Sequence, residues 1–195
     1  MSIHLLTRRP TRAAPETVLT GPISFAHGRV HEICGPARRM LAVMIAARLE
    51  GPVLWIRGAW ARDRVSADGM APHLNPARIV FVDVKRAEDA LWCAEEALRS
   101  GAAPVLIAEL GEPPGLTPVR RLMLAGEAAP DPVLPLLLSP GDGSAQGVES
   151  RWHVVPAHVP GEQCWTLTRL RARLAPPATW ALSLGADTQP VLRVA

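Results

Sequence analysis

One stretch constrains the fold of this chain more than any other, the segment Gly28–Glu50. It predicts a short strand over Arg29–Ile33, a turn at Gly35-Pro36 and then a long apolar helix. From Met40 to Ala47 the helix is apolar on every side, whereas a helix on the surface of a globular protein shows a single apolar stripe. The segment therefore predicts a helix that is covered on both sides or that forms an interface.

A strand, a glycine turn and a helix in this order form the phosphate-binding loop of many nucleotide-binding proteins. Such a loop has Gly, Lys and Ser or Thr at its sixth, seventh and eighth positions. Counted from Gly35, those positions hold Met40, Leu41 and Ala42, and the only lysine of the chain, Lys85, lies elsewhere. We therefore predict a nucleotide-binding fold turned into a binding module, without catalytic residues, cofactor or metal. Its degenerate phosphate-loop positions are Gly35, Pro36, Met40, Leu41 and Ala42.

The middle of the chain alternates between strand and helix patterns. Helices are predicted over Ala87–Ser100 and over Leu116–Ala128, the second with Thr117 as its N-cap. Continuous apolar runs predict buried strands between the helices, and this alternation favours βαβ crossovers in a parallel sheet. The predicted strands are Pro52–Ile56, Arg78–Asp83, Pro104–Ala108 and Val133–Leu138.

The pattern changes after the glycine- and serine-rich segment Ser139–Ser150, which is predicted to be a mobile loop. Short strand-like runs follow with no helix between them, which predicts an antiparallel extension of the sheet. These runs are Arg151–Pro156, Gln163–Arg173, Thr179–Leu184 and Pro190–Val194. Residues 21–195 are therefore predicted to form one three-layer α/β domain, with a mostly parallel central sheet and antiparallel C-terminal strands.

Residues 1–20 contain three arginines and little apolar periodicity, and they are predicted to be a flexible arm. Their resemblance to an arginine-rich targeting segment is the alternative.

The three cysteines are far apart and lack metal-ligand spacing, which indicates reduced thiols in the cytoplasm rather than a zinc site. No apolar run is long enough to span a membrane. A formal net charge of +3 permits contact with nucleic acid or an acidic partner and requires neither.

Two arginines and one acid are candidates near the predicted phosphate loop. Arg38 and Arg39 lie in the first turn of the helix, where the helix dipole disfavours cations unless an anion is close. They bind a partner carboxylate or a phosphate in one interpretation, and are simply solvated in the other. Glu109 follows a buried strand where a nucleotide hydrolase holds Mg²⁺, but an ordinary surface position is the favoured interpretation.

The run Gln163–Arg173 alternates so that Trp165, Arg169 and Arg171 are predicted to face the same side. A tryptophan beside a row of arginines suits single-stranded DNA. The same charges also protect an edge strand from unwanted pairing, which is the alternative. Trp92 is predicted to be exposed, as the aromatic anchors of protein interfaces are before binding.

Several of these segments resemble a known family. Gly28–Pro36 resembles the first strand and phosphate-loop entry of RecA-type recombinases. The segments Asp89–Ala102 and Leu116–Ala125 resemble the ImuA family, as do Arg151–Val154 and Trp165–Leu182. The resemblance covers residues 22–184, and Asp89–Ala102 is its most specific part.

Members of the ImuA family are RecA-like accessory factors of DNA-damage-induced, mutagenic translesion synthesis. The resemblance implies a RecA-like fold and a non-enzymatic protein that binds a catalytically inactive Y-family polymerase homologue (ImuB-like). A second C-family replicative polymerase, RecA and DNA are further partners that it allows, and self-association stays open. The candidate contact residues are Arg38, Arg39, Trp92, Trp165, Arg169 and Arg171.

Two other functions stay open at the level of sequence. One is a cell-division inhibitor of the SulA type, which has a related RecA-like fold and blocks the tubulin-like division protein. The other is a nucleotide hydrolase with an atypical site, in which Arg38 or Arg39 binds phosphate and Glu109 binds the metal.

Overall fold

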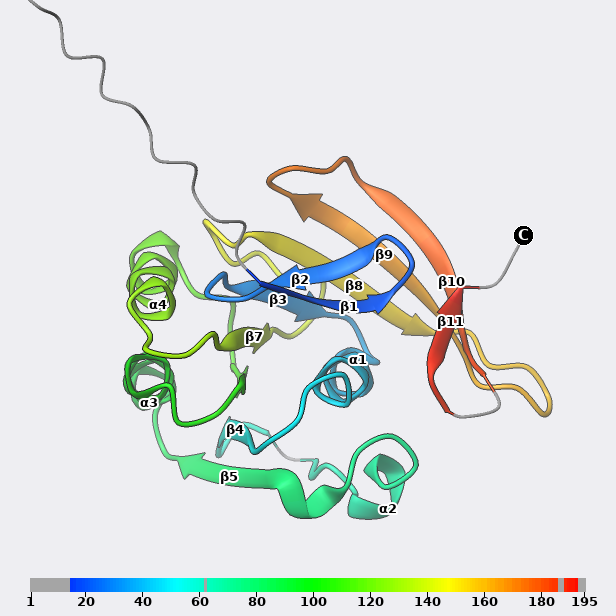
Figure 1. Cartoon of the computed structure of the whole chain (residues 1–195), viewed down its shortest axis with the longest axis horizontal. Helices are drawn as coiled ribbons and strands as arrows, with labels where there is room; N and C mark the ends of the chain where they lie inside the picture. The colour runs from blue at the N-terminus through cyan, green and yellow to red at the C-terminus, as the bar shows by residue number, and fades with distance from the viewer. Residues whose placement is uncertain (1–14, 62, 186–187, 193–195) are drawn as a thin grey trace, which may run out of the picture.

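The computed structural model describes residues 15–61, 63–185 and 188–192. Within them a nine-stranded sheet has the strand order β11-β10-β9-β8-β3-β7-β6-β4-β5, and β1 and β2 form a separate hairpin (Figure 1). Six neighbouring strands, from β8 to β5, run parallel. They are β3 (His31–Cys34), β4 (Val53–Gly58), β5 (Ile79–Val84), β6 (Val105–Glu109), β7 (Leu134–Leu138) and β8 (Ser150–Pro156). The mostly parallel α/β sheet predicted from the sequence is therefore confirmed.

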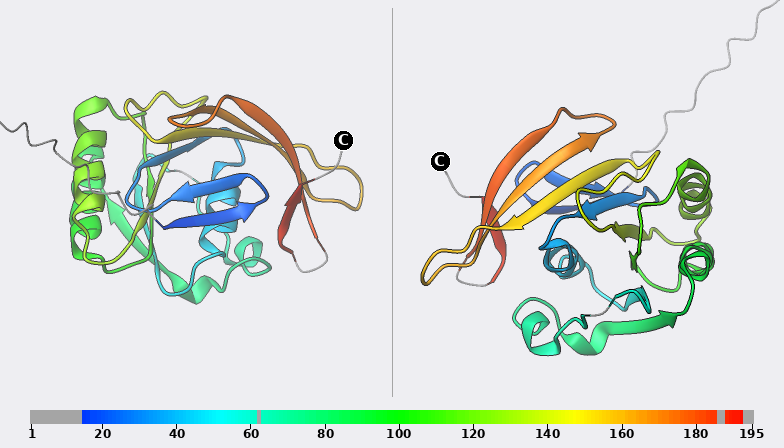
Figure 2. Two further views of the ribbon diagram at one scale, coloured as in Figure 1. Left: turned by 45° about the horizontal axis from the view of Figure 1, so that its top comes forward. Right: turned by 180° about the vertical axis from the view of Figure 1, so that it is seen from behind.

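Helices cover both faces of the parallel strands (Figures 1 and 2). One face carries α1 (Arg38–Ala46), and the other carries α3 (Ala87–Ser100) and α4 (Leu116–Glu127). A short helix α2 (Ala67–Met70) and a 3₁₀ turn at Pro76–Arg78 connect β4 to β5. β6 and β7 are buried at every residue because helices lie on both sides of them. None of the helices in the described residues is long and apolar enough to cross a membrane.

The helix α1 is covered on both sides, as its apolar sequence predicts. Its residues Leu41–Ala46 are all buried between the sheet and the hairpin of β1 (Glu16–Thr20) and β2 (Ile23–Ala26). The predicted flexible arm is therefore wrong for Glu16–Thr20, because Leu19 and Phe25 of the hairpin complete the core over α1. Residues 1–14 lie outside the described residues.

The strand β8 corrects the prediction that everything after residue 150 is antiparallel. It pairs in parallel with β3, and the antiparallel part begins with β9 (Cys164–Ala172), followed by β10 (Ala178–Leu184) and β11 (Pro190–Leu192). A parallel pair needs a crossover connection, which the sequence suggested only where a helix was predicted. Here the loop between β7 and β8 makes the crossover past the end of β3 without a helix.

The predicted helix boundaries are close to those observed. α3 spans Ala87–Ser100 as predicted and ends at Gly101, which has a left-handed φ of 63°. α4 begins at Leu116, but its N-cap is Gly115, which offers no side-chain cap, so the prediction of Thr117 as N-cap is wrong. Thr117 lies inside the first turn, because the helix starts two residues before Pro118.

Candidate functional site

The carboxyl ends of the parallel strands meet at one edge of the sheet, where the loops after β3, β4, β6 and β7 surround a pocket of about 380 Å³. Open α/β sheets hold their ligands at such an edge. The pocket, here called the strand-end pocket, brings together Pro36, Arg38, Arg39 and Glu109, as the sequence suggested. It adds Trp60 and Asp63 from the loop after β4.

The backbone amides of the turn that precedes α1 donate hydrogen bonds to carbonyl oxygens of the protein itself. The Gly35 N–H donates to the Gly141 carbonyl at 2.9 Å, and the Ala37 N–H donates to the Val154 carbonyl at 3.2 Å. Gly35 has a φ of 88°, and a Cβ there would lie 2.5 Å from the Val154 oxygen. A phosphate-binding loop leaves such amides free for the ligand, whereas here carbonyl oxygens take them.

The side chains after the turn are apolar. Leu41 and Ala42 are buried in the core, and Met40 is half-buried against it. These are the positions at which a phosphate-binding loop presents its lysine and hydroxyl groups. The first turn of α1 also lacks an acid and a side-chain cap.

Glu109 is buried rather than on the surface, so the favoured interpretation from sequence is wrong. Its carboxylate accepts from Arg39 Nε at 2.8 Å and pairs with Arg39 Nη2 at 2.5 Å. Trp60 is half-buried, and its Nε1–H donates to the Glu109 carbonyl at 3.3 Å. The carboxylate that would hold a metal is thus neutralised within the chain, and Arg39 has the acidic partner that its position requires.

Arg38 is the second cation of the strand-end pocket. Its Nη1 donates to the Gly35 carbonyl at 3.2 Å, and its buried Nε lacks a partner within the described residues. No group of three or more His, Cys, Asp or Glu side chains that could hold a metal occurs in the part of the chain that the structure describes. The pocket therefore offers a guanidinium donor, that of Arg38, to a ligand.

A buried cluster behind the turn joins β3 to the loop between β7 and β8. Glu32 is fully buried; its carboxylate pairs with Arg151 Nε at 2.5 Å and accepts from the Ser144 and Ala145 amides at 3.1 Å. The glycine-rich loop predicted to be mobile is therefore anchored at its centre. Sequence reasoning missed Glu32, although an acid inside a buried strand always needs a partner.

Cys34, the last residue of β3, is not a reactive thiol. Its Sγ–H donates to the Asp142 and Trp152 carbonyls at 3.0 and 3.3 Å. Burial, together with the nearby Glu32 carboxylate, raises the pKa of the Cys34 thiol to about 12. The thiolate that nucleophilic chemistry needs is therefore scarce at neutral pH.

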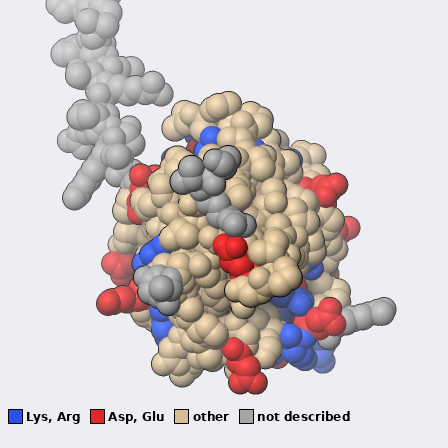
Figure 3. Space-filling view, turned by 90° about the vertical axis from the view of Figure 1, so that its right-hand side faces the viewer, with Lys and Arg blue, Asp and Glu red and all other residues tan. Residues whose placement is uncertain are grey.

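The strand β9, predicted as a candidate DNA-binding strand, does not place Trp165, Arg169 and Arg171 together on one exposed side. Trp165 is 3% exposed and packs edge-on against His158, so it cannot stack on a base. A bulge at Leu170 pairs Arg169 with Trp152 and Arg171 with Arg151. Arg151 and Trp152 are consecutive in β8, so their side chains face opposite sides of the sheet. Their partners in β9, Arg171 and Arg169, therefore also face opposite sides. Figure 3, which views the molecule from the β10–β11 side, shows charges of both signs scattered over the described residues of that face.

Arg169 instead lies over two tryptophan rings, with its guanidinium carbon 5.0 Å from the Trp180 centroid and 5.6 Å from that of Trp152. We expect Arg169→Gln to lower the free energy of unfolding by about 1 kcal/mol, because these cation–π contacts are lost. Urea unfolding followed by tryptophan fluorescence measures the change. The exposed Arg171→Gln is the matched control, and equal losses in the two variants would contradict the assignment.

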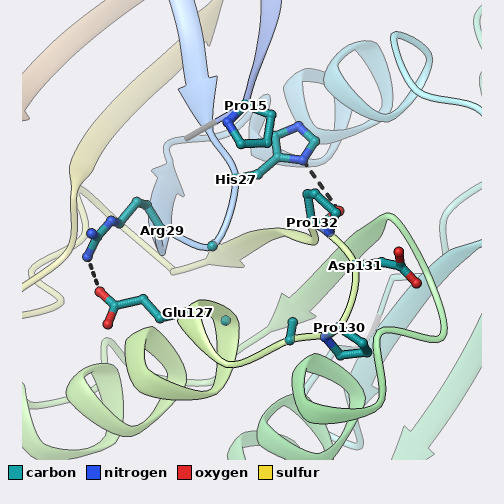
Figure 4. A pocket seen from close by; sticks show the side chains of 10 residues that line it. Pro15, His27, Arg29, Glu127, Pro130, Asp131 and Pro132 are labelled. Atoms are coloured by element: carbon teal, nitrogen blue, oxygen red, sulfur yellow. Dashed lines mark hydrogen bonds and ion pairs between the residues drawn. The ribbon is translucent and has the colours of Figure 1, made fainter. Parts of the chain in front are cut away.

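A further pocket, of about 270 Å³, lies at the opposite edge of the sheet, where the turn before β3 meets the end of α4 (Figure 4). Two of its polar side chains, those of Arg29 and His27, already have partners within the protein. Arg29 pairs with Glu127, and His27 Nδ1–H donates to the Pro132 carbonyl at 3.4 Å. Burial lowers the pKa of His27, which keeps the ring neutral. These contacts hold the turn before β3 against the end of α4 and the segment that follows it.

Trp92 projects from α3, which lies on the face of the sheet opposite α1, and it is 60% exposed, as predicted. The candidate residues thus fall into three groups. Arg38 and Arg39 lie in the strand-end pocket, Trp92 lies on α3, and Arg169 and Arg171 lie on opposite sides of β9. Leu124 on α4 is 65% exposed and was missed, because the helical pattern alone does not show which apolar residue stays uncovered.

No protein-family model matches the chain, and none of the curated proteins matches its sequence.

Proposed function

We propose that this chain is a non-enzymatic accessory protein of DNA-damage-induced translesion mutagenesis, with a RecA-like fold and a degenerate phosphate loop. It acts in the cytoplasm by binding a catalytically inactive Y-family polymerase homologue. A second C-family replicative polymerase, RecA and DNA are further contacts of the same assembly.

The observation that carries the non-enzymatic part of the proposal is the ion pair between Arg39 and Glu109 in the strand-end pocket. It fills the place of the phosphate and metal ligands with two charges that satisfy each other. The amides of the turn are bonded to carbonyl oxygens, and apolar side chains stand where lysine and a hydroxyl are needed. Nucleotide hydrolysis requires all of these groups to be free.

The assignment to damage-induced mutagenesis is supported by the ImuA-like segments of the sequence. The most specific of them, Asp89–Ala102, forms most of α3 and includes the exposed Trp92. An exposed tryptophan on a regular helix suits a protein that works by binding another protein.

The test combines affinity capture with genetics. The tagged full chain is expressed in cells with damaged DNA, and the bound proteins are identified by mass. We expect a Y-family polymerase homologue, and we expect deletion of the gene to abolish damage-induced mutagenesis. Capture of the tubulin-like division protein, with cell filamentation on overexpression and normal mutagenesis on deletion, would instead establish a SulA-type inhibitor.

Calorimetric titration of the purified chain with ATP and Mg²⁺ is the companion measurement, and no binding is expected. Mg²⁺-dependent ATP binding that is lost in Glu109→Ala would overturn the non-enzymatic proposal and favour a nucleotide hydrolase.

A further inference from the structure

Two neighbouring hollows form a groove along the N-terminal halves of α3 and α4. The first, of about 360 Å³, lies between the helices, and Trp92 and Leu122 belong to its apolar lining. The second, of about 280 Å³, lies between the start of α3 and the loop 110–115, which contributes Pro113 and Pro114. The hollows share Glu88, Leu91 and Pro118, so they form one continuous groove.

The charge of this groove is opposite to that of the whole chain. Its lining contains the carboxylates of Glu88, Asp89, Glu95 and Glu112 and a single guanidinium, that of Arg121. Glu95 is bound by two guanidinium groups, that of Arg121 at 2.6 Å and that of Arg99 at 2.5 Å, so the acidic character of the groove depends on Glu88, Asp89 and Glu112. Arg86 reaches Glu88 and Asp89 from outside the groove, but these pairs are exposed and weak. An acidic groove on a chain of net charge +3 favours a basic occupant.

The length of the groove along α3 suits a helical occupant. One hollow reaches Glu95 on α3 and the other reaches Ala87, with the shared Leu91 between them. The lining of the two hollows on α3 therefore extends over about two helical turns, or roughly 12 Å. Two apolar side chains at positions i and i+4 of a docked helix are about 6 Å apart along its axis and fit within this length.

We propose that the groove between α3 and α4 binds an amphipathic helix of a protein partner. Two apolar side chains at i and i+4 enter the hollows, Trp92 covers one of them, and arginine or lysine on the margins of the helix meets Glu88, Asp89 and Glu112. The inference rests on the proposed function in taking the occupant from a protein partner, but it does not depend on which protein that is.

The chemistry of the groove disfavours nucleic acid, because its carboxylates repel phosphates. It also differs from the strand-end pocket, in which Arg38 supplies a positive charge. Leu110 and Gly111 line both places, so a helix in the groove ends beside the strand-end pocket.

The probe is a fluorescent synthetic helical peptide with leucines at i and i+4 and arginines on both margins, measured by anisotropy with the full chain. A peptide with glutamates in place of the arginines is its control. We expect Trp92→Ala to weaken binding at least about tenfold. The pair Glu88→Gln with Glu112→Gln is expected to weaken it about fivefold, and added salt is expected to weaken it as well. Leu124→Ala, equally exposed on α4 but outside the groove, is expected to bind normally.

Equal binding of the two peptides, or an unchanged affinity in Trp92→Ala, would overturn the inference. Self-association of the chain without peptide, abolished by Trp92→Ala, would also overturn it, because the groove would then hold a second copy. Trp92 is exposed, so Trp92→Ala is expected to leave the midpoint of thermal unfolding unchanged. If that midpoint falls, the affinity of the combined Glu88→Gln and Glu112→Gln variant decides whether the groove binds the peptide. The two proposals can fail separately. If the peptide does not bind, capture of a Y-family homologue still supports the proposed function. If a different protein is captured, binding of the peptide still supports the groove as a helix-binding site.

Discussion

Replacing Glu32 by alanine is expected to lower the free energy of unfolding by about 4 kcal/mol, because the partner charge remains buried without compensation. Arg151 would lose its carboxylate while its side chain stays only 17% exposed. The amides of Ser144 and Ala145 would lose their acceptor, and the crossover loop between β7 and β8 would lose its anchor. Urea unfolding followed by circular dichroism measures the change.

The matched control is Glu127→Ala, which removes an exposed ion pair with Arg29 and should cost less than about 1 kcal/mol. The double replacement of Glu32 by leucine and Arg151 by methionine should cost less than Glu32→Ala, because no charge is left buried. A loss for Glu32→Ala no larger than that for Glu127→Ala would show that the buried pair does not hold the loop.

Stability is expected to fall by about 3 kcal/mol between pH 6.5 and pH 4 because of His31. Burial lowers the pKa of His31 from 6.5 to about 4. Below pH 6.5 the unfolded chain binds a proton that the folded chain excludes, so the free energy of unfolding decreases as the pH falls towards 4. Above about pH 7.5 the ring is neutral in both states and the contribution is constant.

The hydrogen bonds around His31 explain why the neutral ring is preferred. The Trp152 Nε1–H donates to Ser150 Oγ at 2.7 Å, and the Ser150 hydroxyl can donate to His31 Nδ1, also at 2.7 Å. His31 Nε2–H then donates to the Ala26 carbonyl at 3.0 Å. Every group is satisfied with one proton on the ring, and a second proton would put two donors against each other unless the serine hydroxyl turned away.

Unfolding curves between pH 4.5 and pH 7 measure this dependence, and His31→Gln is expected to remove most of the slope. The remaining slope is assigned to His27, whose pKa is also lowered by burial. An NMR titration of the His31 ring protons gives the independent check. A pKa above 6 for that ring would contradict the explanation.

The local sequence was sufficient to predict most of the parallel core. Continuous apolar runs mark strands that are buried on both faces, and the amphipathic pattern of Ala87–Ser100 predicts α3 to the residue. The glycine turn before α1 and the all-round apolar character of that helix also predict its covered position. These patterns reflect burial and backbone geometry close to each residue, which the neighbouring residues in the sequence determine.

The strand-end pocket was predicted in part. The chain order places Arg39 after β3 and Glu109 at the end of β6, at one edge of a parallel sheet, but the sequence does not show that the two side chains neutralise each other. The row of arginines was predicted wrongly, because a single bulged residue, Leu170, reverses the alternation of β9.

The sequence by itself thus determined the parallel core, its helices and the absence of lysine and hydroxyl groups from the phosphate loop. Those features depend on residue type and short-range order. Only the tertiary structure decided that β8 pairs in parallel with β3, that Glu32 meets Arg151, and that the acidic groove forms between α3 and α4. Each of these joins residues that are far apart in the chain, and the pairing of distant segments depends on the packing of the whole domain.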